Sequence, residues 1–227
     1  MREIVLDTET TGFDPDEGDR IVEIGALELM GHMPTGRTFH EYLDPEREVS
    51  PGAVEVHGLT NEFLAGKPKF AQVARSFLDF VGDAKLVIHN AAFDIKFLDA
   101  ELGWSGHPLL TMERAIDTLQ MARRKFPGSP ASLDALCRRF GVDNSGREKH
   151  GALLDSELLA EVYLELIGGR QPGLVLAARE RKAAADAGPW RPRPRPVPLP
   201  ERITDGERAA HAAFVEELGD GALWSRT

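Results

Sequence analysis

Short apolar runs along the first half of the chain predict the strands of a central β-sheet. These runs cover residues 4–6, 21–29, 37–43 and 86–88, and a further short strand or turn is predicted at 116–117. Runs of this length are typical of buried strands. Because only short links join the first three, including a turn over residues 31–36 that contains Pro34, we expect them to form an antiparallel meander.

Apolar residues at helical spacing predict the helices that flank this sheet. The clearest stripe lies in residues 70–81, where Phe70, Val73 and Phe77 recur at intervals of three and four. Residues 44–58 are predicted to form a loop. Further helices are predicted over 93–102, from 117 to 126, after Ser132 as N-cap, and over 152–166. Strands followed by alternating helices and strands indicate an α/β fold with a mixed central sheet flanked by helices.

The composition changes after residue 169. Prolines occupy every second position from 192 to 200 and alternate with arginines at 191, 193 and 195, which predicts an extended linker. A short apolar helix is predicted at 209–218, beyond this linker. We therefore expect a globular domain at 1–169, a proline- and arginine-rich linker at 170–200, and a docking segment at 201–227, the last two forming a flexible C-terminal tail.

Charge and cysteine content narrow the class of protein. The formal net charge of −10 argues against a protein that holds nucleic acid on a broad basic surface. It is compatible with an enzyme that grips a nucleic-acid end through metal ions. The single cysteine, Cys137, excludes an internal disulfide and lies in an apolar helical pattern, which indicates a core position. No membrane-spanning run or signal-peptide pattern is present, so we expect a cytoplasmic protein.

Four carboxylates and a histidine are the candidates for chemistry. Asp7 and Glu9 stand two residues apart at the end of the first predicted strand, so their side chains share one face. Asp94 opens a predicted helix after a buried strand, and Asp155 follows His150 by five positions. Singly, each has an ordinary explanation as a turn, helix-end or loop residue. Together the carboxylates can hold two Mg²⁺ or Mn²⁺ ions for phosphoryl displacement, while His150 accepts the proton of the attacking water.

Three phrases in this set carry a resemblance to a known family. They are DTETTG at 7–12, HNAAFD at 89–94 and HGALLD at 150–155. In order and spacing they resemble the DEDDh 3′–5′ exonucleases. VHGL at 56–59 and LDALC at 133–137 extend the likeness to the proofreading members that serve bacterial replicative polymerases. The resemblance implies a ribonuclease H-like fold and removal of nucleotides from the 3′ end of DNA as 5′-monophosphates.

The resemblance also implies roles for individual residues. The implied metal ligands are Asp7, Glu9, Asp94 and Asp155. His150 takes the place of the general base, and His57 and Phe93 match residues that contact the terminal nucleotide. The substrate-facing ligands are Asp7, Glu9 and Asp155. His89 is expected behind the site. Close relatives carry an acidic residue where this chain has Gly52, so a side-chain contact to the sugar is not expected there.

The tail carries further resemblances that imply partners. Gln171, Leu174 and Leu176 are spaced as in a short peptide that binds a sliding clamp. Residues 211–224 resemble the C-terminal peptide by which a proofreading subunit docks on its polymerase (alpha) subunit, and a small third core subunit is a further expected partner. A tether of this kind raises the local concentration of a weak DNA binder at the primer end.

Two other functions fit parts of the sequence. A free-standing exonuclease acting on RNA ends would use the same carboxylates, but it has no need of a linker and a terminal anchor. A non-catalytic subunit that stabilises a polymerase would be free to lose a ligand or the base, yet all five residues are present. An inert acidic domain requires every motif to be a coincidence.

Overall fold

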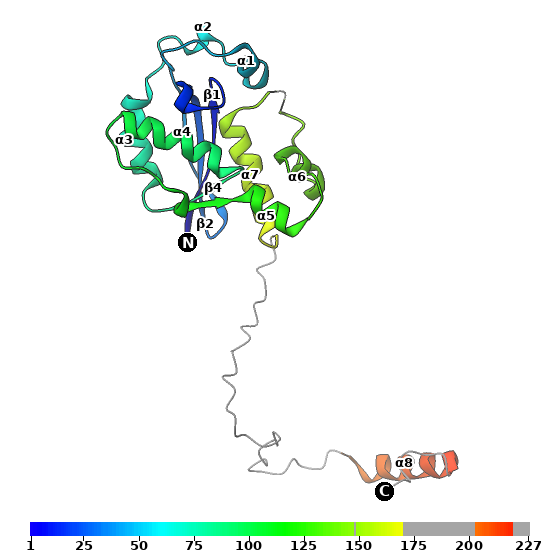
Figure 1. Ribbon diagram of the computed structural model, residues 1–227. Coiled ribbons are helices and arrows are strands. Elements are labelled where there is room, and N and C mark those ends of the chain that lie inside the picture. The colour runs from blue at the N-terminus through cyan, green and yellow to red at the C-terminus, as the bar shows by residue number, and fades with distance from the viewer. Residues whose placement is uncertain (148, 170–202, 220–227) are drawn as a thin grey trace, which may run out of the picture. The chain divides into compact units, whose positions relative to one another are not determined.

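The computed structural model describes residues 1–147, 149–169 and 203–219 (Figure 1). The chain divides into two units, and the first contains the whole of the described β-sheet. The second contributes one described helix, α8 (Asp205–Leu218). The predicted linker, the clamp-binding peptide at 171–176 and the end of the docking segment at 220–227 lie outside the described residues.

A five-stranded mixed sheet forms the centre of the first unit. β1 (Arg2–Thr10), β2 (Ile21–Met30) and β3 (Met33–Tyr42) pair antiparallel, as the predicted meander requires. β4 (Lys85–Ile88) pairs parallel to β1, and β5 (Ala115–Asp117) pairs parallel to β4. The resulting strand order is β3-β2-β1-β4-β5, which confirms the mixed sheet and places β1 at its middle.

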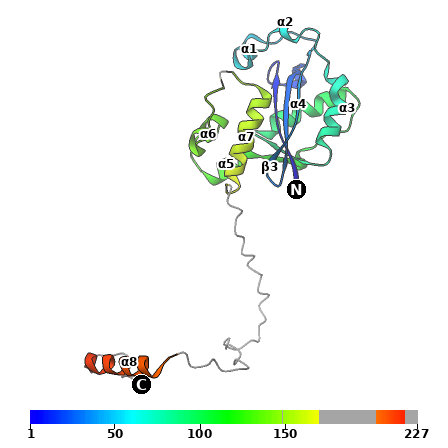
Figure 2. The same ribbon diagram turned by 180° about the vertical axis from the view of Figure 1, so that it is seen from behind.

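Helices cover both faces of this sheet (Figures 1 and 2). Alternate residues of β1 separate the two faces: Ile4 and Leu6 pack in one core with α3 and α4, whereas Val5 packs with α7. The helices of this unit are α1 (Pro51–His57), α2 (Asn61–Leu64), α3 (Phe70–Val81), α4 (Ala91–Trp104), α5 (Thr118–Lys125), α6 (Leu133–Phe140) and α7 (Ala152–Leu166), with short 3₁₀ turns η1 (Pro15–Glu17) and η2 (Met112–Arg114). Cys137 of α6 is buried, as predicted.

The prediction of a turn over residues 31–36 is wrong. The turn consists of Gly31 and His32, whose φ angles of 58° and 68° fit a tight two-residue hairpin. β3 therefore begins at Met33, and Pro34 lies inside it, opposite Leu29. Proline is tolerated there because β3 is the outermost strand of the sheet.

The prediction of a loop over residues 44–58 is wrong in its second half. α1 occupies Pro51–His57, with the Ser50 hydroxyl accepting a hydrogen bond from the Ala53 amide and Pro51 at the first helical position. Gly58 ends the helix at a φ of 78°. Capping residues rather than an apolar stripe define this helix, which is why hydrophobic spacing missed it.

α8 begins four residues earlier than the predicted 209, at Asp205. Thr204 and Glu207 form a capping box, in which each side chain bonds to the backbone amide of the other residue. In the part of the chain that the structure describes, no helix combines the length and apolar character needed to cross a membrane.

Candidate active site

The carboxyl end of β1 opens into a cleft of about 700 Å³. Asp7 and Glu9 reach it from β1, and Phe93 from the first turn of α4. The other predicted site residues in its wall are Asp94, His150 and Asp155. The structure thus gathers the four carboxylates and His150 from one strand, two helices and a loop.

Asp94 is held by Thr8, a residue that the sequence did not single out. Its Oδ1 accepts hydrogen bonds from the Thr8 backbone amide at 3.1 Å and from the Thr8 hydroxyl at 2.8 Å. The chain reaches this position through Asn90, whose left-handed backbone (φ 69°, ψ 52°) turns β4 into α4. Thr8 points away from Asp7 and Glu9 on the strand, so β1 contacts α4 through one face and presents its carboxylates to the cleft on the other.

Asp155 reaches the cleft because α7 lies directly against β2. Gly25 stands opposite Asp7 in the strand pairing, and a Cβ atom at Gly25 would lie 2.1 Å from backbone atoms of Ala152 and Leu153. The absence of a side chain at Gly25 therefore lets the first turn of α7 approach the sheet. Ser156 fixes this contact by donating a 2.9 Å hydrogen bond to the Gly25 carbonyl.

Burial raises the pKa values of three of these carboxyl groups, and for Asp7 and Glu9 repulsion within the set adds to the increase. Burial is the largest cause for Asp7, whose pKa lies well above its usual range, with further increases from Asp94 and Glu9. Burial and the charge of Asp155 raise the pKa of Glu9 to about 8. Burial raises the pKa of Asp94 to about 7, although its bonds from Thr8 oppose the change. The pKa values stay raised although the charge of Arg147 lowers those of Asp7 and Glu9, so the site favours a bound cation.

Arg147 supplies the nearest positive charge and was not found from the sequence. Its Nε and Nη2 donate to the two carboxylate oxygens of Asp155 at 2.5 and 2.6 Å. Nη1 donates to Asp134 Oδ1 at 2.8 Å, and Nη2 lies 2.9 Å from His150 Nδ1. Its position in a polar loop gave no periodic signal, and only its nearness to the HGALLD phrase could have drawn attention to it.

His150 lies at the mouth of the cleft, with its side chain 48% exposed. Partial burial and then the charge of Arg147 lower its pKa below 6.5, so the ring is neutral at neutral pH. Ligand atoms of Glu9, His150 and Asp155 lie within 4.8 Å of one another, which is close enough for one metal ion to contact them together.

Of the two aromatic residues expected to contact the terminal nucleotide, one lines the cleft and the other does not. Phe93 lines the cleft and packs against Phe97 at a tilt of 46°, with 5.0 Å between ring centres. His57 is 5% exposed and is absent from the cleft lining among the described residues. Its Nδ1 accepts a 3.0 Å hydrogen bond from the Leu59 amide. His89 lines the cleft and has its Nδ1 2.9 Å from the Thr118 hydroxyl.

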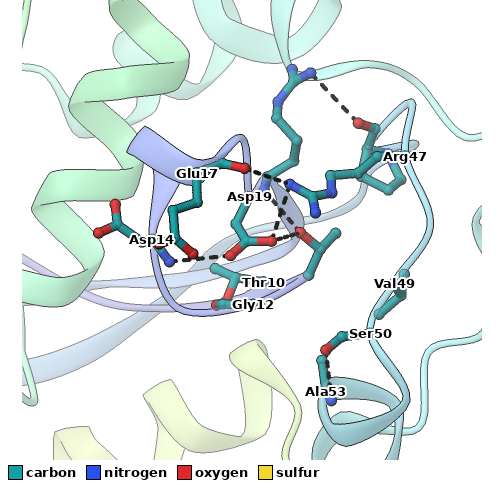
Figure 3. A network of polar contacts seen from close by, with 12 residues as sticks. Thr10, Gly12, Asp14, Glu17, Asp19, Arg47, Val49, Ser50 and Ala53 are labelled. Atoms are coloured by element: carbon teal, nitrogen blue, oxygen red, sulfur yellow. Dashed lines mark hydrogen bonds and ion pairs between the residues drawn. The ribbon is translucent and has the colours of Figure 1, made fainter.

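The loop after β1 carries Phe13 to the cleft, where its side chain is 89% exposed. Figure 3 shows how Asp19 supports this loop from inside. Asp19 accepts hydrogen bonds from the Thr11 hydroxyl at 2.9 Å and the Asp14 amide at 3.2 Å, and Arg47 pairs with it at 3.2 Å. A Cβ at Gly12 would lie 2.3 Å from the Asp19 carboxylate, so the glycine allows this close approach.

The match to a known family covers most of the first unit. A family model described as Exonuclease matches residues 4–163. The chain belongs to the exonuclease family. This exonuclease is 59% identical over 174 residues to the DNA polymerase III subunit epsilon of Rickettsia felis, a match that covers 75% of this chain and 76% of that protein. It is 44% identical over 236 residues to the protein of the same name in Escherichia coli, covering 98% and 97%.

Solved structures agree with this assignment. The exonuclease is 27% identical to Exonuclease X in complex with 5′ overhanging duplex DNA, with a TM-score of 0.59 over 73% of this chain and 90% of that one. The nuclease domain of 3′hExo, described as a DEDDh family member, shares the fold at a TM-score of 0.62 and 22% identity, over 73% and 91% of the two chains. The predictions of a DEDDh-type exonuclease and of a hydrolytic nuclease are confirmed, and this family depends on divalent metal ions.

Proposed function

We propose that the exonuclease is the proofreading subunit of a bacterial DNA polymerase III core, removing nucleotides from the 3′ end of DNA as 5′-monophosphates. The observation that carries this proposal is the convergence of four carboxylates and His150 in one cleft. The likeness of nearly the whole chain to a DNA polymerase III subunit epsilon supports the proofreading role.

The donor set fits two divalent metal ions. Asp7, Glu9, Asp94 and Asp155 offer only oxygen, which suits Mg²⁺ or Mn²⁺. The raised pKa values of Asp7, Glu9 and Asp94 reflect charges that are buried together without sufficient compensation, and a bound cation relieves this repulsion. When bound, such ions lower the pKa of the attacking water and neutralise charge at the scissile phosphate.

Residues of the chain accept the proton, orient a metal ligand and contact the nucleotide. His150 lines the cleft with a ring that is neutral at pH 7, and it takes the proton of the attacking water. Thr8 keeps Asp94 oriented through its two hydrogen bonds. Asp7, Glu9 and Asp155 face the terminal nucleotide, and Phe93 offers its ring to the base. His57 contacts that nucleotide only after a change that exposes its buried ring.

The C-terminal part of the chain is proposed to attach the nuclease domain to the polymerase. We assign residues 1–169 to the nuclease domain, 170–200 to a linker and 201–227 to the segment that docks on the polymerase (alpha) subunit. α8 exposes Phe214 and Leu218, which offer an apolar contact for that partner. Residues 171–176 are proposed to bind the sliding clamp, and a small third core subunit remains a further proposed partner.

Digestion of a 5′-labelled primer–template tests the catalytic part. With Mg²⁺ or Mn²⁺ we expect stepwise loss of single nucleotides, faster at a mispaired 3′ end, and no loss in chelator. Asp7→Asn should abolish the reaction, whereas Asp16→Asn, at a carboxylate 81% exposed, should leave it unchanged. A folded wild-type protein that cuts under no metal condition would contradict the proposal and favour a structural subunit.

Shortening the chain tests the attachment. A protein that ends at Gly169 should keep its nuclease activity on the same primer and lose co-elution with the polymerase subunit. If the shortened protein still co-elutes with that subunit, the docking role of residues 201–227 is wrong. A preference for RNA over DNA ends in competition assays would instead favour a free-standing RNA exonuclease.

A further inference from the structure

Arg147 contacts three acidic or basic side chains of the cleft at once. Its side chain is only 7% exposed, although it belongs to the loop between α6 and α7. The guanidinium grips both oxygens of Asp155, bonds to Asp134 on α6, and approaches His150 Nδ1. A two-pronged, nearly buried arginine–carboxylate pair is the strongest form of such a contact.

Arg147 contacts the same atoms that metal binding and proton transfer require, namely the Asp155 oxygens and a ring nitrogen of His150. Both oxygens of Asp155 already accept from Arg147, so a metal ion must share or displace these bonds. Arginine has donors and no acceptor, so Nδ1 of His150 must be the accepting nitrogen. The proton of the neutral ring then sits on Nε2. In this arrangement neither ring nitrogen has a lone pair free for a proton from water.

We propose that Arg147 competes with the divalent metal ions for Asp155, and that its displacement by a metal ion frees Asp155 and His150 together. This inference rests on the proposed function, because it takes Asp155 as a metal ligand and His150 as the base. It makes Arg147 a positioning residue that couples metal binding to the availability of the base. Asp134 keeps the displaced guanidinium beside the cleft through its separate bond to Nη1.

Arg147 could also weaken metal binding simply by adding positive charge to the region, without its bonds to Asp155. A second arginine nearby, Arg138, serves as the control for this alternative. Arg138 lines the polar groove that continues from the cleft, together with Arg147 and His150. It is exposed, and among the described residues it forms no hydrogen bond or ion pair with Asp155. Removal of Arg138 therefore changes the charge of the same region without releasing Asp155.

Direct metal binding tests the proposal without reliance on activity. Mn²⁺ affinity is measured by titration calorimetry and electron paramagnetic resonance on the full chain without DNA. Arg147→Met should bind Mn²⁺ about tenfold more tightly than the wild type, because a competing cation is gone. Arg138→Met should stay within about twofold of the wild type. Equal or weaker binding by Arg147→Met, or equal tightening in Arg138→Met, overturns the proposal.

Two further measurements separate the possible failures. If neither the wild type nor Arg147→Met binds Mn²⁺, the proposed metal site itself fails. Arg147→Lys keeps the positive charge but cannot bond both oxygens of Asp155 and also reach His150. It should bind Mn²⁺ about threefold more tightly than the wild type. This variant replaces Arg147→Met if the methionine variant does not fold. In ¹⁵N-histidine spectra, Mg²⁺ should shift the His150 Nδ1 signal of the wild type more than that of Arg147→Met. Equal shifts in the two proteins overturn the proposal.

Discussion

The hydroxyl of Ser156 donates a 2.9 Å hydrogen bond to the backbone carbonyl of Gly25. This contact joins the N-terminal part of α7 to β2 at the position where β2 stands opposite Asp7. Because Asp155 directly precedes Ser156, the same contact determines how closely the carboxylates of α7 and β1 approach. The geometry of the cleft therefore depends on a glycine that carries no chemistry.

Gly25→Ala should disrupt both stability and activity. The new methyl group would lie 2.1 Å from the helix backbone at Ala152 and Leu153, and a backbone cannot move aside as a flexible side chain does. We expect a loss of about 3 kcal/mol in the free energy of unfolding and a large fall in kcat, measured by urea denaturation and primer digestion. Gly103→Ala in α4, where the nearest atom lies at 3.9 Å, is the matched control and should be neutral or stabilising.

Stability in chelator should fall as the pH rises. Folding raises the pKa of Glu9 from 4.5 to about 8 and that of Asp94 from 3.8 to about 7. Between these values the folded state binds more protons than the unfolded state, so the free energy of unfolding decreases as the pH rises. Urea denaturation from pH 4.5 to 8 measures this slope.

The same experiment carries its own controls. Glu9→Gln should flatten the slope, whereas Glu17→Gln, at an exposed position, should leave it unchanged. Added Mg²⁺ should restore stability at pH 8, because it binds the charged folded site and not the unfolded chain. A wild-type stability that is flat across this range in chelator would show that the carboxylates do not repel one another as described.

Activity should have an acid limb below pH 6.5. Burial and Arg147 lower the pKa of His150 from 6.5, so the ring loses its proton, and becomes able to accept one, at a lower pH than free histidine. His150→Gln should reduce kcat by about 10²–10⁴-fold and remove this limb from the pH profile. His107→Gln, outside the cleft lining, should retain it. An unchanged limb in the His150 variant would exclude His150 as the base.

Asp19→Ala should weaken substrate binding more than the chemical step. Asp19 holds the loop that carries Phe13, through Thr11, the Asp14 amide and Arg47, but it does not line the cleft. We expect KM for the primer to rise several-fold with a smaller change in kcat, and stability to fall by about 1–3 kcal/mol. If kcat falls and KM is unchanged, the loop acts on catalysis and not on binding.

Elements with an apolar stripe could be predicted from the sequence. α7 begins and ends at the predicted residues 152 and 166, and α3 at 70 and 81, because burial on a sheet requires apolar residues at helical spacing. The phrases around Asp7, Asp94 and Asp155 likewise predicted residues that the structure gathers in one cleft. A catalytic site that requires several residue types in a fixed order can be recognised from the sequence as a set of motifs.

Contacts between loops and element ends could not be predicted in this way. Arg147 is a charged residue in a polar loop, and its partners Asp155 and Asp134 stand 8 and 13 residues away. Gly25 looks like any small residue in a strand until α7 is seen against it. α1 has only His57 fully buried, so hydrophobic spacing gave no sign of it, although Ser50, Pro51 and Gly58 marked its ends.

Pro34 has a consequence for how copies of this chain meet one another. In a two-residue hairpin the pair beside the turn, Met30 and Met33, is hydrogen-bonded, and the next pair, Leu29 and Pro34, is not. The nitrogen of Pro34 therefore faces away from β2, where an ordinary residue would present an amide to any approaching strand. An outer strand with a broken row of donors is a poor template for aggregation. Pro34 thus makes it harder, at high local concentration, for the β3 edge of one molecule to extend the sheet into the next.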